Sequence, residues 1–352
     1  MTQMRYDVAI AGDGPAGLAA AIALLERGFS VVNVSPSSSD QPSRAEMLPP
    51  AADPIITRLG IAELLDEAVP LRPALGLWAN PYPERSFLSA QRSAISINRN
   101  MLSSLMRKRV KSCGGHFRNG RLQGISGSSG EWQIAVGSGV VLRTRFAIDA
   151  TGRPAHLARR LGARLQFGAQ LVARTMCLPE RVQSQLVIEA TENGWWYALP
   201  FPRGGMLGFL GEPQIEPDVP TLLPMPGDFA MHAKCWDARN AVLNRCTGPG
   251  WLATGDAATA FDPIASQGLF NALSGGFFAG NAAACALTGQ PDALETYAQL
   301  VARTASHTHH AMPQHYATAH GHSDFWHQRR AATFSLPAKL HGRSQRQSLN
   351  SI

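Results

Sequence analysis

The feature that most constrains the fold is a glycine turn near the N-terminus, set between a short apolar run and a helical pattern. Residues 5–10 predict a strand, residues 18–27 a helix and residues 30–34 a second strand. The turn between the first two has the form G-x-G-x-x-G and consists of Gly12, Asp13, Gly14, Pro15, Ala16 and Gly17. In this context Gly12 allows the tight turn, Gly14 lets the backbone approach a pyrophosphate, and Gly17 lets the helix pack on the strand. The segment predicts a Rossmann-type nucleotide-binding unit whose helix N-terminus, at Pro15 and Ala16, faces the phosphates.

The end of the second predicted strand departs from the usual pattern. Glu or Asp at this position normally binds both ribose hydroxyls, and here the residue is Ser35. A serine hydroxyl makes a hydrogen bond but does not grip the diol from both sides. We therefore expect Ser35 to hold the adenosine side weakly and other contacts to compensate.

Three shorter segments resemble flavin-binding elements. Residues 44–50 (RAEMLPP) resemble the R-x-G-E-x-L-P-P element of one flavoprotein subgroup, and Arg44 and Glu46 can hold cofactor oxygens or each other. Arg99 opens a helical stretch and resembles an arginine that contacts FAD from another side. Gly152 lies in the sequence DATGR at 149–153, which resembles a turn that follows a parallel strand beside the nucleotide.

The most specific of these segments spans residues 250–280. An apolar strand leads to Asp256, which in such flavoproteins bonds the ribityl chain. A loop follows that contains Pro263, Gln267 and Gly268 and leads into a helix beginning near Leu269. The N-terminus of that helix carries about half a positive charge and would face the pyrimidine edge, where reduced flavin is negative. Together with the glycine turn, this segment predicts FAD as the cofactor.

These residues are together similar to the family of flavin-dependent tryptophan halogenases and their monooxygenase relatives. Within it the closer likeness is to the short flavoproteins that mature tryptophylquinone cofactors, and it runs from residue 5 to about residue 330. The resemblance implies an FAD-dependent oxidoreductase, a monooxygenase that hydroxylates an indole or tryptophan substrate through a C4a-hydroperoxyflavin. It leaves open whether this aromatic substrate is a small molecule or a tryptophan in a precursor protein. No second glycine turn exists for a nicotinamide cofactor, so we expect a separate reductase or a supply of reduced flavin.

The middle of the chain argues against halogenation. Residues 194–200 (GWWYALP) stand where the halogenases have W-x-W-x-I-P, and residues 60–100 contain no lysine, although the resemblance requires one there. For a hydroxylase the candidate catalytic residues are Glu46, Trp196 and Asp262. Carboxylates in flavin signatures more often hold the cofactor, and Trp196 belongs either to a packed aromatic cluster or to a surface that stacks on the substrate.

The predicted fold class is α/β: a Rossmann-like FAD-binding domain with an inserted antiparallel β-sheet substrate domain and C-terminal helices. The elements assign 1–70, 97–165 and 250–300 to a discontinuous FAD-binding domain, and 71–96 and 166–249 to the substrate domain. Residues 301–330 are expected to form a helical cap and 331–352 a tail.

Composition narrows the range of partners. The net charge is +7, and only four basic residues are lysines (Lys108, Lys111, Lys234 and Lys339). Arginine suits anionic ligands, although a genomic bias explains the excess equally well. The basic residues are scattered without interleaved aromatics, which predicts no nucleic-acid binding. No apolar run reaches the ~18 residues of a membrane span, so we expect a soluble, cytoplasmic protein without membrane contact.

Neither cysteines nor histidines predict a metal site. The five cysteines contain no C-x-x-C pair, and seven of the eleven histidines crowd into residues 307–327 at spacings that do not suit ligation. We interpret the histidines as a solvated helix face that covers the nucleotide-binding domain.

Other functions remain open for the same signatures. A small-molecule aromatic hydroxylase or a halogenase-like enzyme differs in substrate, and a flavin reductase of isoprenoid double bonds would require an apolar tunnel. A non-enzymatic protein that holds FAD and binds a precursor polypeptide is the fourth alternative.

Overall fold

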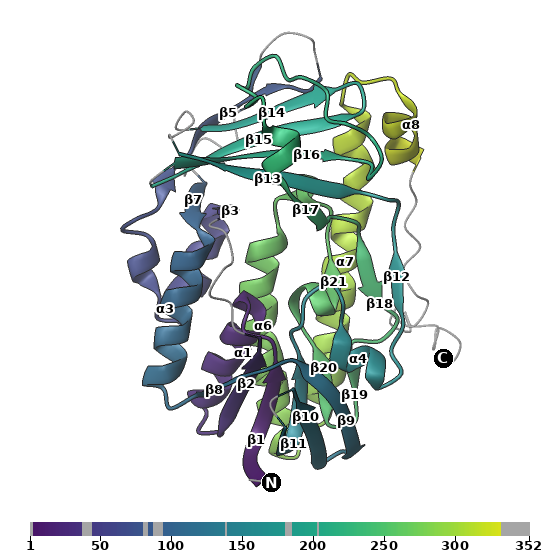
Figure 1. Cartoon of the computed structure of the whole chain (residues 1–352). Helices are drawn as coiled ribbons and strands as arrows, with labels where there is room; N and C mark the ends of the chain where they lie inside the picture. The colour runs from purple at the N-terminus through teal and green to yellow at the C-terminus, as the bar shows by residue number, and fades with distance from the viewer. Residues whose placement is uncertain are drawn as a thin grey trace, which may run out of the picture.

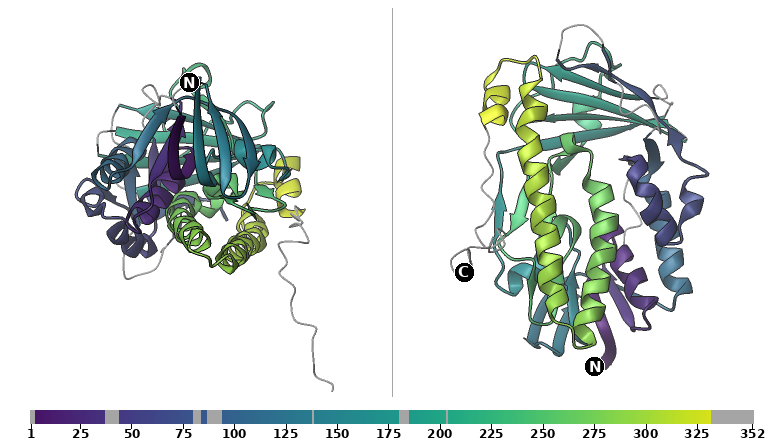
Figure 2. Two further views of the ribbon diagram at one scale, coloured as in Figure 1. Left: turned by 90° about the horizontal axis from the view of Figure 1, so that it is seen from below. Right: turned by 180° about the vertical axis from the view of Figure 1, so that it is seen from behind.

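The computed structural model describes residues 3–36, 44–79, 84–86, 94–137, 139–179, 185–202 and 204–331. Two large sheets lie at opposite ends of the molecule, and two long helices run beside them (Figures 1 and 2). In the part of the chain that is described, no helix is both long enough and apolar enough to cross a membrane. The predicted α/β class is confirmed.

The first sheet has eight strands and a parallel centre. Its order is β19-β20-β11-β1-β2-β8, and β10 and β9 extend it beside β11. Strand β1 pairs in parallel with both β2 and β11, and its successive residues Val8, Ala9 and Ile10 are buried, so that both of its faces are covered. The strands are β1 (Gln3–Ala11), β2 (Val31–Ser35), β8 (His116–Asn119), β9 (Leu122–Ser128), β10 (Glu131–Val136), β11 (Val140–Asp149), β19 (Thr247–Gly248) and β20 (Trp251–Ala253).

Helices α1 (Pro15–Leu25), α3 (Arg99–Ser112) and α6 (Gly268–Leu287) pack around this sheet (Figure 1). Helix α6 lies directly on α1, because a Cβ at Gly276 would stand 2.2 Å from the Ala16 carbonyl oxygen and one at Gly280 2.5 Å from that of Ala20. Only glycine permits this close approach. The two helices that begin at the predicted cofactor segments are therefore in backbone contact.

The second sheet has seven strands in the order β17-β13-β16-β15-β14-β5-β6. All its pairs are antiparallel except β14 with β5. One face is covered by α5 (Phe229–His232) and the segment before it, and the other turns toward the first sheet (Figure 1). Its strands are β5 (Arg72–Leu77), β6 (Glu84–Ser86), β13 (Val172–Leu178), β14 (Gln185–Thr191), β15 (Gly194–Phe201), β16 (Gly204–Gly211) and β17 (Lys234–Asp237).

Short elements join the two large sheets. Two three-stranded sheets, β3-β7-β4 and β12-β18-β21, lie between them. The elements are β3 (Ala45–Leu48), β4 (Val69–Pro70), β7 (Ile95–Asn98), β12 (Leu165–Phe167), β18 (Ala241–Leu243), β21 (Thr259–Ala260), α2 (Asp53–Arg58), α4 (His156–Arg160), η1 (Pro50–Ala52), η2 (Ala62–Leu64), η3 (Gly255–Ala257) and η4 (Pro263–Ala265).

Helix α7 (Asp292–Ala317) connects the two sheets, and α8 (Asp324–Ala331) follows it (Figure 2). The Tyr297 hydroxyl donates to the Ala253 carbonyl of the first sheet at 3.0 Å, whereas the Trp78 indole donates to the His315 carbonyl at 3.0 Å. The domain boundary expected between residues 300 and 301 falls inside this helix. Of the expected tail, residues 332–352 lie outside the described residues.

The histidine-rich segment does not cover the nucleotide-binding unit as expected. The end of α7 and α8 pack on the seven-stranded sheet through Tyr316, Phe325 and Trp326. His309 is buried with 7% exposure, and this burial lowers its pKa to about 4. The expectation of a solvated face is wrong for His309, because helical periodicity turns this position toward the protein interior.

Candidate active site

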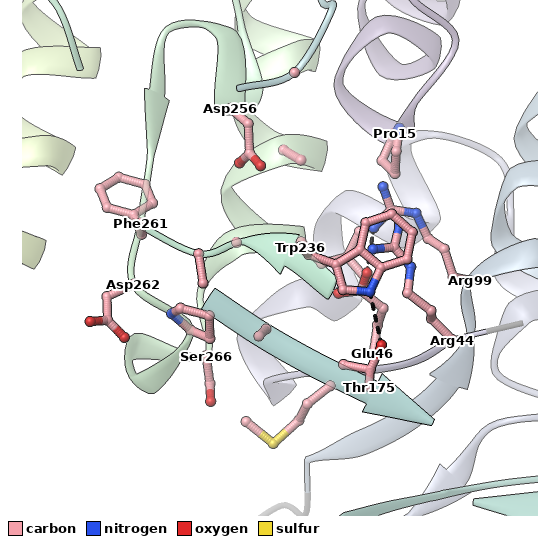
Figure 3. A pocket seen from close by; sticks show the side chains of 18 of the residues that line it. Pro15, Arg44, Glu46, Arg99, Thr175, Trp236, Asp256, Phe261, Asp262 and Ser266 are labelled. Carbon is pink, nitrogen blue, oxygen red and sulfur yellow. Dashed lines mark hydrogen bonds and ion pairs between the residues drawn. The ribbon is translucent and has the colours of Figure 1, made fainter. Parts of the chain in front are cut away.

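One cavity of about 360 Å³ joins the predicted cofactor segments to the seven-stranded sheet. Its first wall, the cofactor wall, contains Gly14, Arg99 and Asp256. Its second wall, the substrate wall, contains Trp195 and Tyr197. Figure 3 shows side chains from both walls pointing toward this space. A molecule that fills the cavity would contact both large sheets.

The glycine turn has the geometry that a dinucleotide requires. Gly12 adopts a φ of +118°, and a Cβ there would lie 2.1 Å from the Ala150 carbonyl oxygen. A Cβ at Gly17 would lie 2.6 Å from the Gly12 carbonyl oxygen, whereas one at Gly14 would meet no atom within 4 Å. No side chain among the described residues caps the N-terminus of α1, so its N–H groups remain available to a phosphate. The turn fits the pyrophosphate of FAD.

Arg44, Glu46 and Arg99 form a charged cluster on the cofactor wall. The Arg99 guanidinium and the Glu46 carboxylate are 2.5 Å apart, and the Arg99 amide donates to the Arg44 carbonyl at 2.9 Å. The Arg44 guanidinium lies 4.6 Å from the centre of the Trp236 ring, and burial lowers its pKa. The Trp236 indole donates to the Thr175 hydroxyl at 2.9 Å (Figure 3). Backbone pairing of β3 with β7 brings the two predicted arginines together.

Asp256 lies at the start of η3 and faces the same cavity as Gly152 and Arg153. The Arg153 Nε atom is 3.8 Å from the Asp256 carboxylate, and its guanidinium also donates to the Phe261 carbonyl at 3.0 Å. Burial raises the pKa of Asp256, and the positive charge of Arg153 opposes this rise. The carboxylate can therefore accept hydrogen bonds from a polyol such as the ribityl chain.

The loop after Asp262 is fixed by that residue. Its carboxylate accepts from the Ile264 amide at 3.0 Å and from the Tyr316 hydroxyl at 2.8 Å. The Arg329 guanidinium lies 4.0 Å away, and Asp262 and Arg329 are 2% and 7% exposed. Burial raises the pKa of Asp262, while Arg329 opposes the rise. Asp262 thus orients the loop through bonds to backbone and helix α7.

The loop itself leads to the start of α6 as the sequence predicts. Pro263, Gly268 and Leu269 line the cavity. Gln267 stands at the N-cap of α6, and its side-chain oxygen accepts from the Thr308 hydroxyl at 3.3 Å instead of lining the cavity.

Ser35, the residue expected to hold the adenosine side, does not line the cavity. It ends β2, where its carbonyl accepts from the Gly120 amide at 2.9 Å.

The prediction that Trp196 is a candidate catalytic residue is wrong, because its side chain lies on the other face of β15. Successive residues of a strand point to opposite faces, so Trp195 and Tyr197 line the cavity while Trp196 points away from it. The Trp196 indole donates to the Asp218 carbonyl at 2.8 Å and packs on Phe209 and Phe229. Trp196 is therefore a core residue, and Trp195 and Tyr197 replace it as candidate substrate contacts.

Sequence reasoning missed two contributions to this site. Trp236 and Thr175 come from neighbouring strands β17 and β13, and no motif marks either. The partners of Asp262, Tyr316 and Arg329, lie on the C-terminal helices. Gly208 stands opposite Tyr197 on β16, and because a Cβ there would lie 2.3 Å from the Tyr197 ring, glycine at this position leaves room for that ring.

A metal site requires several ligating side chains that come together. Within the described ranges, no three His, Cys, Asp or Glu side chains come together as metal ligands.

Known proteins are similar to the chain in sequence and in fold. No family model matches the chain. A curated protein of Pseudoalteromonas luteoviolacea (strain 2ta16), named 1H-pyrrole-2-carbonyl-[peptidyl-carrier protein] brominase, is 23% identical over 318 residues. The match covers 81% of this chain and 78% of that protein.

Solved structures show the same fold over nearly the whole chain. The myxobacterial chondrochloren halogenase CndH has a TM-score of 0.81 at 17% identity, over 96% of this chain and 88% of its own. The peptidyl tryptophan dihydroxylase QhpG, essential for tryptophylquinone cofactor biogenesis, has a TM-score of 0.73 at 19% identity, over 99% and 81%. The flavin-dependent brominase Bmp2 has a TM-score of 0.73 at 19% identity, over 90% and 87%.

These likenesses confirm the predicted resemblance and the predicted fold. The architecture is that of the flavin-dependent halogenases and of the hydroxylase QhpG. The names of the similar proteins agree with FAD as the cofactor and with an oxidoreductase.

Proposed function

We propose that the chain is an FAD-dependent monooxygenase that hydroxylates an indole or tryptophan side chain in the cavity between the two large sheets. The observation that carries this proposal is the continuity of the cavity. The pyrophosphate turn at Gly14, the carboxylate of Asp256 and the aromatic wall of Trp195 and Tyr197 all line one space.

The cofactor would be held by residues of the first wall. Gly12 and Gly17 allow the turn to form, Gly14 leaves room for the pyrophosphate at the start of α1, and Asp256 would accept from the ribityl hydroxyls. Gly268 and Leu269 at the start of α6 would face the ring edge. Bound and reduced, FAD supplies the electrons that activate dioxygen for transfer of one oxygen atom to an electron-rich ring.

The chain's own side chains would orient the substrate and exclude water. Trp195, Tyr197 and Trp236 offer ring faces and edges to an aromatic substrate, and Leu186 and Ile188 keep this end of the cavity apolar. Glu46 is bound to Arg99 and Asp262 to Tyr316, so both carboxylates act as positioning residues in the proposal. Apolar walls around the reacting atoms limit wasteful reaction with water.

Halogenation is the second candidate because the curated relative is named a brominase. In the resemblance, halogenation depends on a lysine near the substrate. Of the lysines within the described ranges, Lys108, Lys111 and Lys234, none lines the cavity. This observation supports hydroxylation over halogenation.

The partners follow from the same proposal. The cavity holds one dinucleotide turn, so a separate reductase or free reduced flavin would deliver electrons. The net charge of +7 would favour encounter with an acidic precursor polypeptide, since charge complementarity raises association rates. In QhpG the substrate is a peptidyl tryptophan, and we propose an indole side chain of the same kind here.

The experiment uses the FAD-loaded protein, chemically reduced under argon. It is mixed with aerated buffer that contains N-acetyl-tryptophanamide or a tryptophan-containing peptide, together with bromide. Mass spectrometry should show addition of one oxygen atom to the indole, because each reduced flavin supplies two electrons. A brominated indole would establish the halogenase alternative, and unchanged indole with rapid release of hydrogen peroxide would contradict both.

A further inference from the structure

Arg44 carries a charge in the cavity that no other side chain neutralises at close range. Within the described ranges, its guanidinium takes part in no ion pair and donates no hydrogen bond, although it lines the cavity. None of its nitrogens belongs to the enclosed polar atoms that lack a partner, so the group is open to the cavity. A half-buried cation in this state costs free energy, and a bound anion would recover it.

The other charged residues of the described cavity lining are paired. Each lies within 4.0 Å of an opposite charge, in the pairs Arg99 with Glu46, Arg153 with Asp256, Asp237 with Arg239, and Asp262 with Arg329. Burial lowers the pKa of Arg44, Glu46 opposes this from beyond ion-pair distance, and Arg99 adds to it. The unpaired charge of this lining is therefore one cation, at Arg44.

The Arg44 side chain reaches the substrate wall. Arg44 precedes β3, but its guanidinium lies 4.6 Å from the centre of the Trp236 ring on β17 (Figure 3). Burial raises the pKa of the Tyr197 phenol, and the positive charge of Arg44 opposes this rise, which places Arg44 near this ring too. Leu199 and Met206, which pack beside Tyr197, also line the cavity. A molecule held at Arg44 would therefore have aromatic and apolar side chains around the rest of it.

The cofactor has other partners in the proposed function. The uncapped N–H groups at the start of α1 face the position proposed for the pyrophosphate, and Asp256 faces that of the ribityl chain. Neither position requires Arg44, whose guanidinium stacks on a ring of the seven-stranded sheet. The sequence alone predicts that Arg44 holds cofactor oxygens, but its place over Trp236 favours a group of the substrate.

A second cation stands at the edge of the cavity. Lys234 is exposed, lies opposite Thr175 across β13 and β17, and comes two residues before Trp236. Thr175 and Trp236 line the cavity, so Lys234 belongs to the same face of the sheet. Burial raises the pKa of the Cys177 thiol, and the charges of Lys234 and Arg44 both oppose this rise, which places both cations near this thiol. An anion that enters from this side would meet Lys234 first and Arg44 next.

We propose that Arg44 binds a carboxylate carried by the aromatic substrate, and that Trp236 and Tyr197 hold its ring. This assignment rests on the proposed function for the presence of an indole in the cavity. The planar guanidinium can donate two parallel hydrogen bonds to one carboxylate, a geometry that an ammonium group does not offer. The carboxylate belongs either to a small indole acid or to an acidic residue next to tryptophan in a precursor peptide.

The test compares ligands that differ only in this group, by calorimetric titration of the oxidised, FAD-loaded protein. Indole-3-propionate should bind about tenfold or more tightly than indole-3-propionamide, the value of a hydrogen bond to a charged group. A Trp-Asp peptide blocked at both ends should likewise bind more tightly than its Trp-Asn counterpart if a precursor protein is the source. A preference confined to the small acid would identify a small-molecule substrate. Equal affinity within both pairs, or no binding of any of the four, would overturn the proposal.

Variants distinguish the substrate from the cofactor as the partner of Arg44. Arg44→Met should remove the preference for the acid and leave FAD affinity little changed, and Arg44→Lys should keep part of the preference. Arg303→Met, the same change at an exposed position outside the cavity lining, is the matched control and should keep all of it. A preference that survives in Arg44→Met, or a large loss of FAD affinity in that variant, contradicts the assignment.

Binding to the oxidised protein involves no oxygen transfer. The product assay of the proposed function can therefore fail while the preference for the acid stands, and the preference can fail while the product forms. The comparison of ligands in the unaltered protein requires no variant to fold.

Discussion

The two walls of the candidate active site are built by different means. On the cofactor wall, backbone conformation decides the fit: Gly12 and Gly17 stand where a Cβ would collide with backbone oxygens. On the substrate wall, side chains decide it, and Trp195, Tyr197 and Trp236 come from strands β15 and β17. In the proposed function the first wall would recognise a constant group, the pyrophosphate, whereas the second could change its specificity without altering the backbone.

The largest expected effect would break the cofactor wall. Gly12→Ala places a Cβ 2.1 Å from the Ala150 carbonyl oxygen at a φ of +118°, so the free energy of unfolding should fall by about 3 kcal/mol or more and FAD binding should be lost. Urea unfolding and FAD fluorescence titration measure the two effects. Gly14→Ala is the control: its Cβ meets no atom within 4 Å, so stability should change by less than about 0.5 kcal/mol while FAD affinity falls. Equal stability of the two variants would contradict the claim that Gly12 is needed for the fold and Gly14 only for FAD binding.

The next effect concerns the loop that joins the two walls. Arg329→Met leaves the buried Asp262 carboxylate without its cation and should lower the free energy of unfolding by about 3 kcal/mol. Chemical denaturation measures this change. Arg303→Met, at an exposed position of the same pair of helices, should stay within about 0.5 kcal/mol of the unaltered protein. A loss confined to the Arg303 variant would mean that Asp262 does not need Arg329.

A pH effect tests helix α7, which contacts both sheets. Burial lowers the pKa of His309 to about 4 from the ordinary 6.5, so the unfolded chain binds more protons between these values. Stability should therefore be complete above pH 6.5 and fall as the pH drops toward 4, by about 3 kcal/mol from this residue.

His309→Leu isolates this contribution. The slope of unfolding free energy against pH between 4 and 6.5 should decrease in His309→Leu and remain in the exposed control His307→Leu. Thermal unfolding followed by circular dichroism at several pH values measures both. An unchanged slope in the His309 variant would show that this ring titrates normally.

The smallest expected effect tests which tryptophan of the second sheet contacts the substrate. Trp236→Leu removes a half-buried ring from the cavity and should raise the KM for an indole substrate about tenfold, with kcat little changed, because one aromatic contact contributes about 1.4 kcal/mol. Trp196→Leu should instead lower stability and leave KM unchanged, since its ring packs on Phe209 and Phe229. Steady-state kinetics and denaturation of both variants give the comparison. A raised KM in Trp196→Leu alone would reverse the assignment of the two faces.

The same contrast explains what the sequence alone could predict. The glycine turn, Asp256 and the loop to Leu269 are contiguous motifs whose chemistry depends on local backbone geometry, so they could be found without a structure. The choice between Trp195 and Trp196 could not, because strand β15 is buried on both faces and alternation alone does not say which face meets the cavity. The bonds of Asp262 to Tyr316 and Arg329 depend on how α7 and α8 pack, which no local pattern records.

The close contact of α1 with α6 has a consequence for how the molecule takes up its cofactor. Gly276 lies against Ala16, and Gly280 lies against Ala20 and the methyl group of Ala23, so that the backbones of the two helices meet directly. Moving α1 relative to α6 would cost free energy, because close backbone packing would be lost without a replacement. We therefore expect the ends of both helices at the cavity to move together, so that any opening for an incoming dinucleotide would come from the opposing sheet.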